Sequence, residues 1–255
     1  MKTRHLLNKL AKLYPKKYAE QFHDYVGLQV GKLKADTNRI LLCLDFDEEL
    51  MNEAIKFQPD LIITHHPFIY GTFKKVLTSD PQKKELVNNI LKNNLCIYSY
   101  HTNFDFGDRG MNDKLASLLG LENIYKATKY PMMRIGYLKE EMDVFEFAKF
   151  AKKSLCVDYG LLIHEGPNKI KKVGIIGGGG SYEYIYAKEE GCDIYISGDV
   201  SHHLRREMVR YHQNYLDLPH EIEKAFMPQM YEILKEIDSS LDIKIIDHEK
   251  LPKVI

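Results

Sequence analysis

The sequence predicts an α/β fold, because short apolar runs alternate with helical patterns and several of these runs end in polar, donor-bearing residues. The first half follows the order strand, helix, strand, helix, strand, which is typical of a parallel sheet with right-handed crossovers. Ligands of such sheets bind beyond the carboxyl ends of the strands. We therefore expect functional residues directly after the strands.

The first set of elements runs to about residue 120. Its predicted helices cover residues 3–20, 48–57, 81–93 and 113–119. A turn and a short strand are predicted over 24–31, and further strands over 39–44, 61–64 and 95–100. Asp80 with Pro81 has the pattern of an N-cap and a first-turn proline. Asp45 and Asp47 could serve as ligands, but Asp47 before two glutamates is more simply a helix N-cap.

A second set begins near Lys126. Its predicted strands cover residues 134–138, 159–164, 172–176, 193–197 and 243–246, and its predicted helices cover 143–156, 182–190, 201–211 and 219–236. The four glycines at 177–180 lack the lysine of a phosphate loop, so we interpret them as a tight strand-to-helix turn. No Pro- or Ser-rich linker is present, so the predicted boundary between a first domain (1–127) and a second domain (128–255) is soft.

Composition excludes several classes of protein. Lys+Arg and Asp+Glu both number 36, so the net charge is zero and nothing indicates a nucleic-acid partner. No run approaches the ~20 apolar residues of a membrane span, and the first residues lack a signal-peptide pattern, so we expect a cytoplasmic protein. The widely spaced cysteines exclude a Cys-rich zinc site and are expected to be buried thiols: Cys43, Cys96, Cys156 and Cys192.

Two adjacent histidines at a strand end are the most informative feature of the chain. His65 and His66 follow the apolar run 61–64 and precede Pro67. In a regular strand their imidazoles would point to opposite faces. If the strand ends at His65, both can converge and serve two neighbouring metal ions. A surface pair of histidines is the ordinary alternative.

Three other segments place donors in the same way. Two of them follow apolar runs over 95–100 and 192–197, and the third follows Pro219, which marks a helix start. The donors in these segments are His101 and Asp105, His202 and His203, and His220 and Glu223. The last two are three residues apart and would share one face of a helix. Four segments of one kind predict a common site.

A dinuclear metal centre is the chemistry that this pattern favours. Its most economical ligand set is His65, His66, Asp105, His220 and Glu223. Two divalent ions polarise a substrate oxygen and acidify a water, which is hydrolytic chemistry, and these donors suit zinc, iron, manganese or nickel without choosing among them. We expect His101 to be a further ligand or an orienting group, Asp199 to be an orienting group, and His202 and His203 to transfer protons or contact substrate. Taken singly, each is also explained as a satisfied polar residue at a strand end.

These segments together resemble the Nif-three-like dinuclear metal-centre family, whose bacterial members are labelled GTP cyclohydrolase I type 2 homologues. The resemblance covers nearly the whole chain, and its most specific parts are Thr-His-His-Pro at 64–67 and His-Thr-Asn-Phe-Asp at 101–105. It implies two α/β domains with mainly parallel or mixed sheets, a metal pair in the cleft between them, and a toroidal homohexamer built as a trimer of dimers. The length is similar to that of short members, which lack an inserted central domain.

The resemblance also implies an activity and a ligand set. The family's ligands fall on the five residues named above, with one departure: the glutamate usually lies four residues after the last histidine, where this chain has Lys224. Glu223 is the expected substitute and Glu221 the weaker candidate. The implied reaction converts GTP and water to formate and 7,8-dihydroneopterin triphosphate, on two divalent ions per chain. A phosphoester hydrolase, or a non-enzymatic metal chaperone or regulatory scaffold, is the alternative.

Overall fold

The computed structural model describes residues 1–255, and the chain forms two compact units. The first consists of Met1–Asp108 and Phe226–Glu249, and the second of Arg109–Ala225 and Lys250–Ile255. This division differs from a single boundary at residue 127, because the chain returns to the first unit after residue 225. A buried strand has the same apolar pattern in either unit, so the sequence could not show this return.

The first unit is built on a five-stranded sheet with the order β1-β4-β3-β2-β11. Edge strand β1 is antiparallel to β4, and the other neighbours are parallel. The strands are β1 (Gly27–Val30), β2 (Arg39–Cys43), β3 (Leu61–Thr64), β4 (Ile97–Ser99) and β11 (Asp242–Ile245). The helices are α1 (Thr3–Leu13), α2 (Lys17–Glu20), α3 (Glu48–Phe57), α4 (Phe73–Ser79), α5 (Pro81–Lys92), α6 (Thr102–Phe106) and α11 (Phe226–Ile237).

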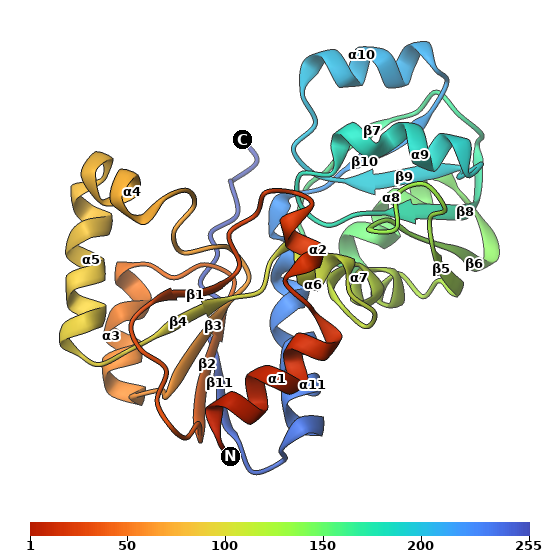
Figure 1. Ribbon diagram of the computed structural model, residues 1–255. Helices are drawn as coiled ribbons and strands as arrows, with labels where there is room; N and C mark the ends of the chain where they lie inside the picture. The colour runs from red at the N-terminus through yellow and green to blue at the C-terminus, as the bar shows by residue number, and fades with distance from the viewer. The chain divides into compact units, whose positions relative to one another are not determined.

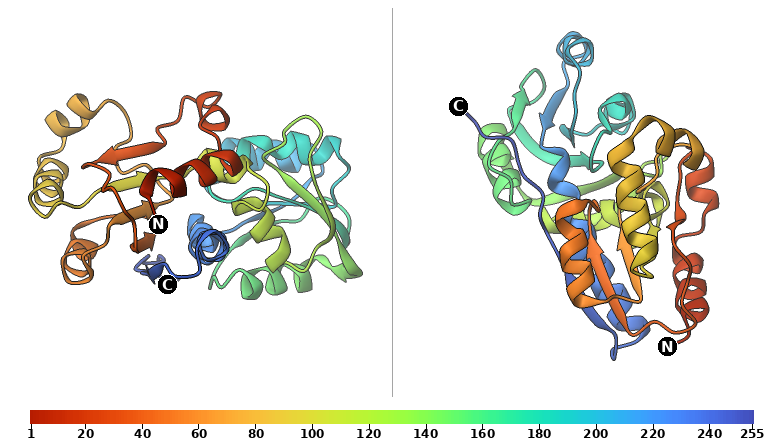
Figure 2. Two further views of the ribbon diagram at one scale, coloured as in Figure 1. Left: turned by 60° about the horizontal axis from the view of Figure 1, so that its bottom comes forward. Right: turned by 90° about the vertical axis from the view of Figure 1, so that its left-hand side faces the viewer.

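Helices cover both faces of this sheet (Figures 1 and 2). Helices α3 and α5 lie on one face, and α1 and α11 lie on the other. Apolar side chains of α3 and α5 pack against those of the strands in one buried cluster, which includes Leu41, Ile62, Ile97, Leu50 and Ile90. Both predicted N-caps are confirmed, since Asp47 accepts hydrogen bonds from the amides of Glu49 and Leu50 and Asp80 accepts one from that of Lys83.

The predicted elements of the first unit differ from the structure in three places. The predicted helix over 3–20 is divided into α1 and α2, because Pro15 cannot donate the hydrogen bond that would continue α1. Helices α4 and α6 were not predicted; both are short, with 7 and 5 residues. Short helices carry too few repeats to produce a periodic pattern.

The second unit is built on a six-stranded mixed sheet with the order β5-β6-β8-β9-β10-β7. The central neighbours β8, β9 and β10 are parallel, and the outer pairs are antiparallel. The strands are β5 (Glu122–Lys126), β6 (Arg134–Asp143), β7 (Leu161–Ile163), β8 (Lys169–Ile175), β9 (Ile194–Ser197) and β10 (Asn214–Asp217). The helices are α7 (Met111–Leu118), α8 (Val144–Ser154), α9 (Tyr184–Glu189), α10 (His202–Arg210) and the 3₁₀ segments η1 (Ser181–Glu183) and η2 (His220–Ala225).

Three findings in this part of the chain correct the predictions. The predicted helix over 219–236 is the 3₁₀ segment η2 followed by α11, and these belong to different units. Strand β5 was not predicted. Cys156 is exposed, because it follows α8 in a left-handed conformation with a φ of 55°, whereas the other cysteines are buried as expected.

The predicted α/β class with mixed sheets is confirmed in both units. No helix combines the length and the apolar character that crossing a membrane requires. The sheet order also brings the carboxyl ends of the parallel strands together within each unit, which is where the donors were expected.

Arg134 anchors α7 to β6 in the second unit. Its side chain is 1% exposed, and its guanidinium donates to Asp113 Oδ1 at 2.5 Å and to Asp113 Oδ2 at 3.1 Å. The carbonyl oxygens of Pro131 and Met132 accept further hydrogen bonds from it. A buried guanidinium needs such a bidentate carboxylate to offset the cost of leaving water.

We expect Asp113→Ala to lower the free energy of unfolding of the second unit by about 3 kcal/mol, because it leaves the buried Arg134 charge without this carboxylate. Denaturant unfolding followed by circular dichroism measures the change. The control is Glu146→Ala, whose pair with Lys149 is exposed and should cost less than about 1 kcal/mol. Equal losses in both variants would contradict the anchoring role.

Candidate metal centre

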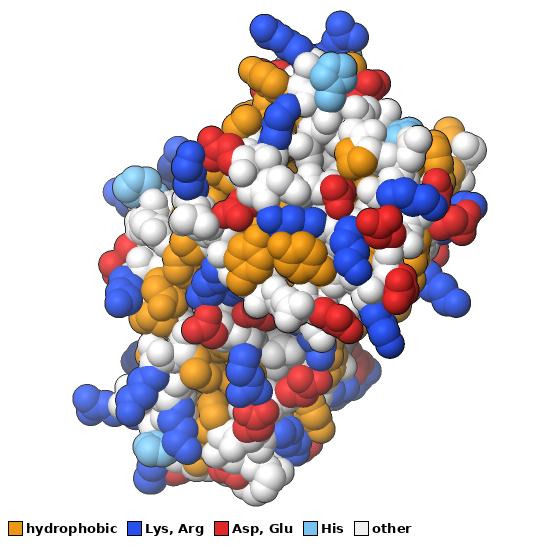
Figure 3. Space-filling view, turned by 90° about the vertical axis from the view of Figure 1, so that its right-hand side faces the viewer, with side chains coloured by type: hydrophobic (Ala, Val, Ile, Leu, Met, Phe, Trp, Pro, Cys, Tyr) orange, Lys and Arg blue, Asp and Glu red, His pale blue; other side chains and the backbone are white.

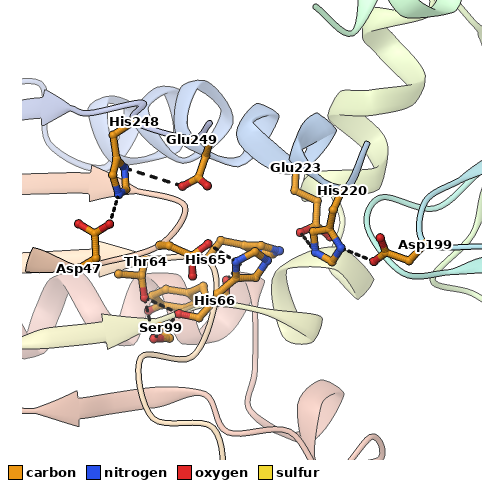
Figure 4. A network of polar contacts seen from close by, with 12 residues as sticks. Asp47, Thr64, His65, His66, Ser99, Asp199, His220, Glu223, His248 and Glu249 are labelled. Carbon is orange, nitrogen blue, oxygen red and sulfur yellow. Dashed lines mark hydrogen bonds and ion pairs between the residues drawn. The ribbon is translucent and has the colours of Figure 1, made fainter. Parts of the chain in front are cut away.

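The backbone leaves the strand geometry at His65, which lets two adjacent imidazoles lie together. Strand β3 ends at Thr64, and the amides of both His65 and His66 donate to the carbonyl of Leu44, each at 3.1 Å. The hydroxyls of Thr64 and Ser99 donate to the carbonyl of His66 and hold this turn (Figure 4). The two rings are therefore 5.1 Å apart instead of facing opposite sides of the sheet.

His101 joins this pair. It follows β4, the neighbour of β3, and its ring centroid lies 5.1 Å from that of His65 and 5.6 Å from that of His66. One nitrogen from each of the three rings lies within 4.8 Å of the others, which is a spacing suited to metal ligands. Three imidazoles form a donor set that zinc and other first-row divalent ions accept.

An oxygen acceptor lies at the Nδ1 atom of each of these rings. His65 Nδ1 donates to the carbonyl of Tyr100 at 2.8 Å. His66 Nδ1 contacts Asp45 Oδ2 at 2.7 Å, and His101 Nδ1 contacts Asp24 Oδ2 at 2.8 Å. Because carbonyl and ionised carboxylate oxygens only accept, the ring donates from Nδ1, and a neutral ring then offers the lone pair of Nε2. Metal-binding histidines commonly donate their other ring N–H to a carboxylate or a backbone carbonyl in this way, which fixes the orientation of the ring.

Asp24 is placed by the antiparallel edge strand. Gly27, at the start of β1, pairs with Ser99, at the end of β4, so the residues before β1 lie beside those after β4. Burial opposes ionisation of Asp24, but hydrogen bonds from His101 and Thr102 outweigh it and lower the pKa of Asp24 to about 2. The carboxylate is therefore charged at neutral pH and holds His101 in one orientation.

Asp105 is buried on α6 and faces His65. Its Oδ1 lies 3.6 Å from His65 Nε2, which is too long for a hydrogen bond. Two ligands at 2.0–2.2 Å from one tetrahedral ion are about 3.4 Å apart, so the separation suits shared coordination. Phe226 also packs against His65, with its ring centroid 5.0 Å from that of the imidazole.

The second unit has its own donor set, His220, Glu223 and Asp199 (Figure 4). His220 Nδ1 contacts Asp199 Oδ2 at 2.6 Å, and His220 Nε2 contacts Glu223 Oε2 at 3.0 Å. The acceptor on Nδ1 is again a carboxylate, as for His66 and His101. Glu223 is 4% exposed, so its negative charge is held in a buried position beside the imidazole.

The 3₁₀ geometry of η2 explains the three-residue spacing. Side chains at i and i+3 lie directly above one another in a 3₁₀ helix, whereas an α-helix aligns i with both i+3 and i+4. His220 and Glu223 are therefore brought together without a glutamate at position 224. Glu221 lines a surface pocket of about 290 Å³, which His220 and Asp199 also line.

The hydrogen bond to Glu223 raises the pKa of His220 to about 9, although burial acts in the opposite direction, and Asp199 adds to the increase. The imidazole is thus protonated at neutral pH in the metal-free chain. A divalent ion at this position would replace that proton as the positive partner of the two carboxylates.

His202 and His203 belong to neither group of potential metal ligands. Both are exposed in the first turn of α10, where His203 contacts the Ser201 hydroxyl at 3.0 Å. Basic and histidine side chains gather around α10 at the top of Figure 3. A role of His202 and His203 in proton transfer stays a prediction.

Sequence reasoning missed part of the surroundings of the donors. It did not single out Asp24, and it considered Asp45 only as a weak ligand candidate and not as the partner of His66. Asp199 was expected as an orienting group and does contact His220. Sequence reasoning also missed His248 and Glu249, which follow β11. His248 Nε2 contacts Asp47 Oδ2 at 3.0 Å, and burial together with Asp45 raises the pKa of Glu249 (Figure 4). No spacing rule connects such distant positions.

Comparison with known proteins agrees with the resemblance seen in the sequence. The chain matches Duf34/NIF3 (NGG1p interacting factor 3) over residues 1–252. The chain belongs to this family. A Clostridium perfringens protein named GTP cyclohydrolase 1 type 2 homolog is 31% identical over 260 residues, which cover 99% of this chain and 98% of that protein. A Lactococcus lactis protein of the same name is 31% identical and covers 95% of both chains.

Solved structures of other proteins share the fold. A Bacillus cereus protein related to NIF3 superposes with a TM-score of 0.88 at 23% identity, over 100% of this chain and 99% of that one. A Staphylococcus aureus hypothetical protein gives a TM-score of 0.89 at 22% identity, with the same coverage. This chain therefore shares its fold with both proteins.

We expect metal binding to compete with protonation of His220. Its pKa is raised from 6.5 to about 9, so the stability that its charge supplies to the metal-free chain is complete below pH 6.5 and is lost as the pH rises through 9. An ion needs the neutral ring, so Zn²⁺ binding near pH 7.5 should release about one proton at this residue. Calorimetry in two buffers of different ionisation enthalpy measures the release, which His220→Ala should abolish. Equal release in both proteins would contradict the assignment.

Proposed function

We propose that this protein is a divalent-metal-dependent hydrolase that holds two metal ions per chain through His65, His66, Asp105, His220 and Glu223. The observation that carries the proposal is the arrangement shared by four histidines. In each, an oxygen acceptor lies at Nδ1: Tyr100 O, Asp45, Asp24 and Asp199. One such histidine is common in any protein, but four of them near strand ends favour metal binding.

The charges around the donors support the same conclusion. Asp24 and Asp45 contact donors of the first set, and Asp199 and Glu223 contact His220. The side chains of Asp24 and Glu223 are buried, whereas those of Asp45 and Asp199 are half-exposed. Buried carboxylates need positive partners. Divalent ions would supply that positive charge. They would also reduce the repulsion between these carboxylates and an anionic substrate.

Bound divalent ions would polarise a substrate oxygen and lower the pKa of a water, which supplies a nucleophile at neutral pH. The side chains of this protein prepare that chemistry. Asp24 and Asp45 orient His101 and His66, and the Tyr100 carbonyl orients His65. His101 offers a further Nε2 beside the pair, either as a ligand or as the group that accepts a proton from the substrate.

The names of the relatives make GTP the first candidate substrate. In the candidate reaction, two waters open the imidazole ring of guanine and release C8 as formate. Rearrangement of the ribose and closure of a new ring then return one water and give 7,8-dihydroneopterin triphosphate. Hydrolysis of a phosphoester would use the same donors, since both reactions need a polarised oxygen and an activated water. Fold and donors alone do not choose between them.

A turnover assay tests this proposal directly. The protein, loaded with Zn²⁺, Mn²⁺, Fe²⁺ or Ni²⁺, should release formate from GTP or cleave a phosphodiester, and chelation should abolish the activity. We expect His65→Ala and Asp105→Ala to lower activity at least 100-fold and to reduce the metal content measured by mass spectrometry, because each removes a proposed ligand.

The matched control is His164→Ala, which removes a histidine whose Nδ1 contacts Asn214 and which belongs to neither donor set. It should retain the metal and the activity. A protein that is fully loaded but turns over none of these substrates would favour the metal-binding scaffold. The predicted hexamer and the cytoplasmic location are independent of this outcome.

A further inference from the structure

The four glycines at 177–180 lie against the donors of the second unit. A Cβ atom added at Gly178 would lie 2.2 Å from Glu223 Oε1 and 3.1 Å from His220 Cε1. One added at Gly177 would lie 3.3 Å from Glu223 Cγ, and one at Gly179 would lie 3.3 Å from Asp199 Oδ2. The bare backbone of this loop therefore forms one wall around His220, Glu223 and Asp199.

Several hydrogen bonds fix the loop in this place. The carbonyl of Gly178 accepts from the amide of Gly198 at 2.7 Å and from the Ser197 hydroxyl at 3.0 Å. The buried Asn112 side chain accepts from the amide of Gly177 at 2.8 Å, and the Tyr195 hydroxyl donates to the carbonyl of Gly180 at 2.6 Å. The loop cannot move away from Glu223 without breaking these contacts.

The loop is poorly suited to bind phosphate. A phosphate loop aims its free amides at the ligand from the start of a helix, but here the Gly177 amide is bound to Asn112 and the Gly180 amide to the Gly178 carbonyl. The segment that follows is the three-residue η1. This geometry agrees with the tight strand-to-helix turn expected from the sequence.

We propose that Gly178 is a positioning residue for the metal ion held by His220 and Glu223. The absence of a side chain lets the Glu223 carboxylate lie beside the His220 ring, and the left-handed backbone, with a φ of 62°, turns the loop around it. This inference rests on the proposed metal-binding function.

The experiment compares three Gly→Ala variants of the second unit. Gly178→Ala adds a Cβ against Glu223, whereas Gly120→Ala and Gly191→Ala add one in open space. All three positions have a left-handed φ, at 62°, 64° and 71°. The strain of a left-handed alanine is therefore common to the variants, and only the contacts with Glu223 and His220 differ.

We expect Gly178→Ala to bind the Zn²⁺ ion that depends on His220 about 10- to 100-fold more weakly, the range typical of residues that orient ligands. The two control variants should bind Zn²⁺ as the unmodified protein does. Without metal, Gly178→Ala should also unfold at a lower temperature than either control, because the displaced carboxylate adds to the backbone strain. If Gly178→Ala matches the controls in both measurements, the inference is wrong.

Two further variants keep the test decisive if Gly178→Ala folds poorly. Gly179→Ala has no left-handed strain and a milder contact with Asp199, so its affinity for Zn²⁺ should lie between those of the unmodified protein and Gly178→Ala. The double variant Gly178→Ala with Glu223→Asp should bind Zn²⁺ more tightly than Gly178→Ala alone, because the shorter side chain makes room for the new Cβ. Additive losses in the double variant would contradict the positioning role.

The result for His220→Ala separates the two proposals. If this variant binds as much Zn²⁺ as the unmodified protein, the proposed metal site fails and the role of Gly178 fails with it. If His220→Ala loses an ion but Gly178→Ala behaves like Gly120→Ala, only the positioning role fails.

Discussion

An imidazole has two nitrogens, and the partner of one decides what the other can bind. In this protein, oxygen acceptors hold Nδ1 of His65, His66, His101 and His220 at 2.6 to 2.8 Å. The acceptors place the proton on Nδ1 and direct Nε2 toward other ligands. This arrangement depends on the turn after β3, the edge strand β1, the 3₁₀ segment η2 and the glycine loop.

Sheet topology brings these acceptors to the histidines. In the first unit the histidines follow the parallel strands β3 and β4, and the antiparallel direction of β1 brings Asp24 to the same edge. In the second unit the glycine loop, Asp199 and η2 follow the parallel strands β8, β9 and β10 in turn. Each unit therefore gathers its donors at the carboxyl ends of its strands, as expected for an α/β sheet.

Most strands are predicted from the sequence, because their apolar runs are local patterns. The positions of His65, His66 and His101 directly after strands follow from the same patterns. The sequence could not reveal Asp24 as the partner of His101, since 77 residues separate them and only strand pairing brings them together. The pairing of β11 with β2 in the first sheet likewise depends on tertiary contacts that no local pattern shows. The spacing of His220 and Glu223 was predictable as a shared helix face, but the 3₁₀ form that aligns them depends on packing.

The most direct test of this account is a crystal structure of the metal-loaded protein with anomalous scattering recorded at the metal edge. The account predicts ions about 2.0–2.2 Å from Nε2 of His65, His66 and His220, with every Nδ1 still on its oxygen acceptor. Ions bound through Nδ1, or found instead at His202 and His203 on α10, would contradict it.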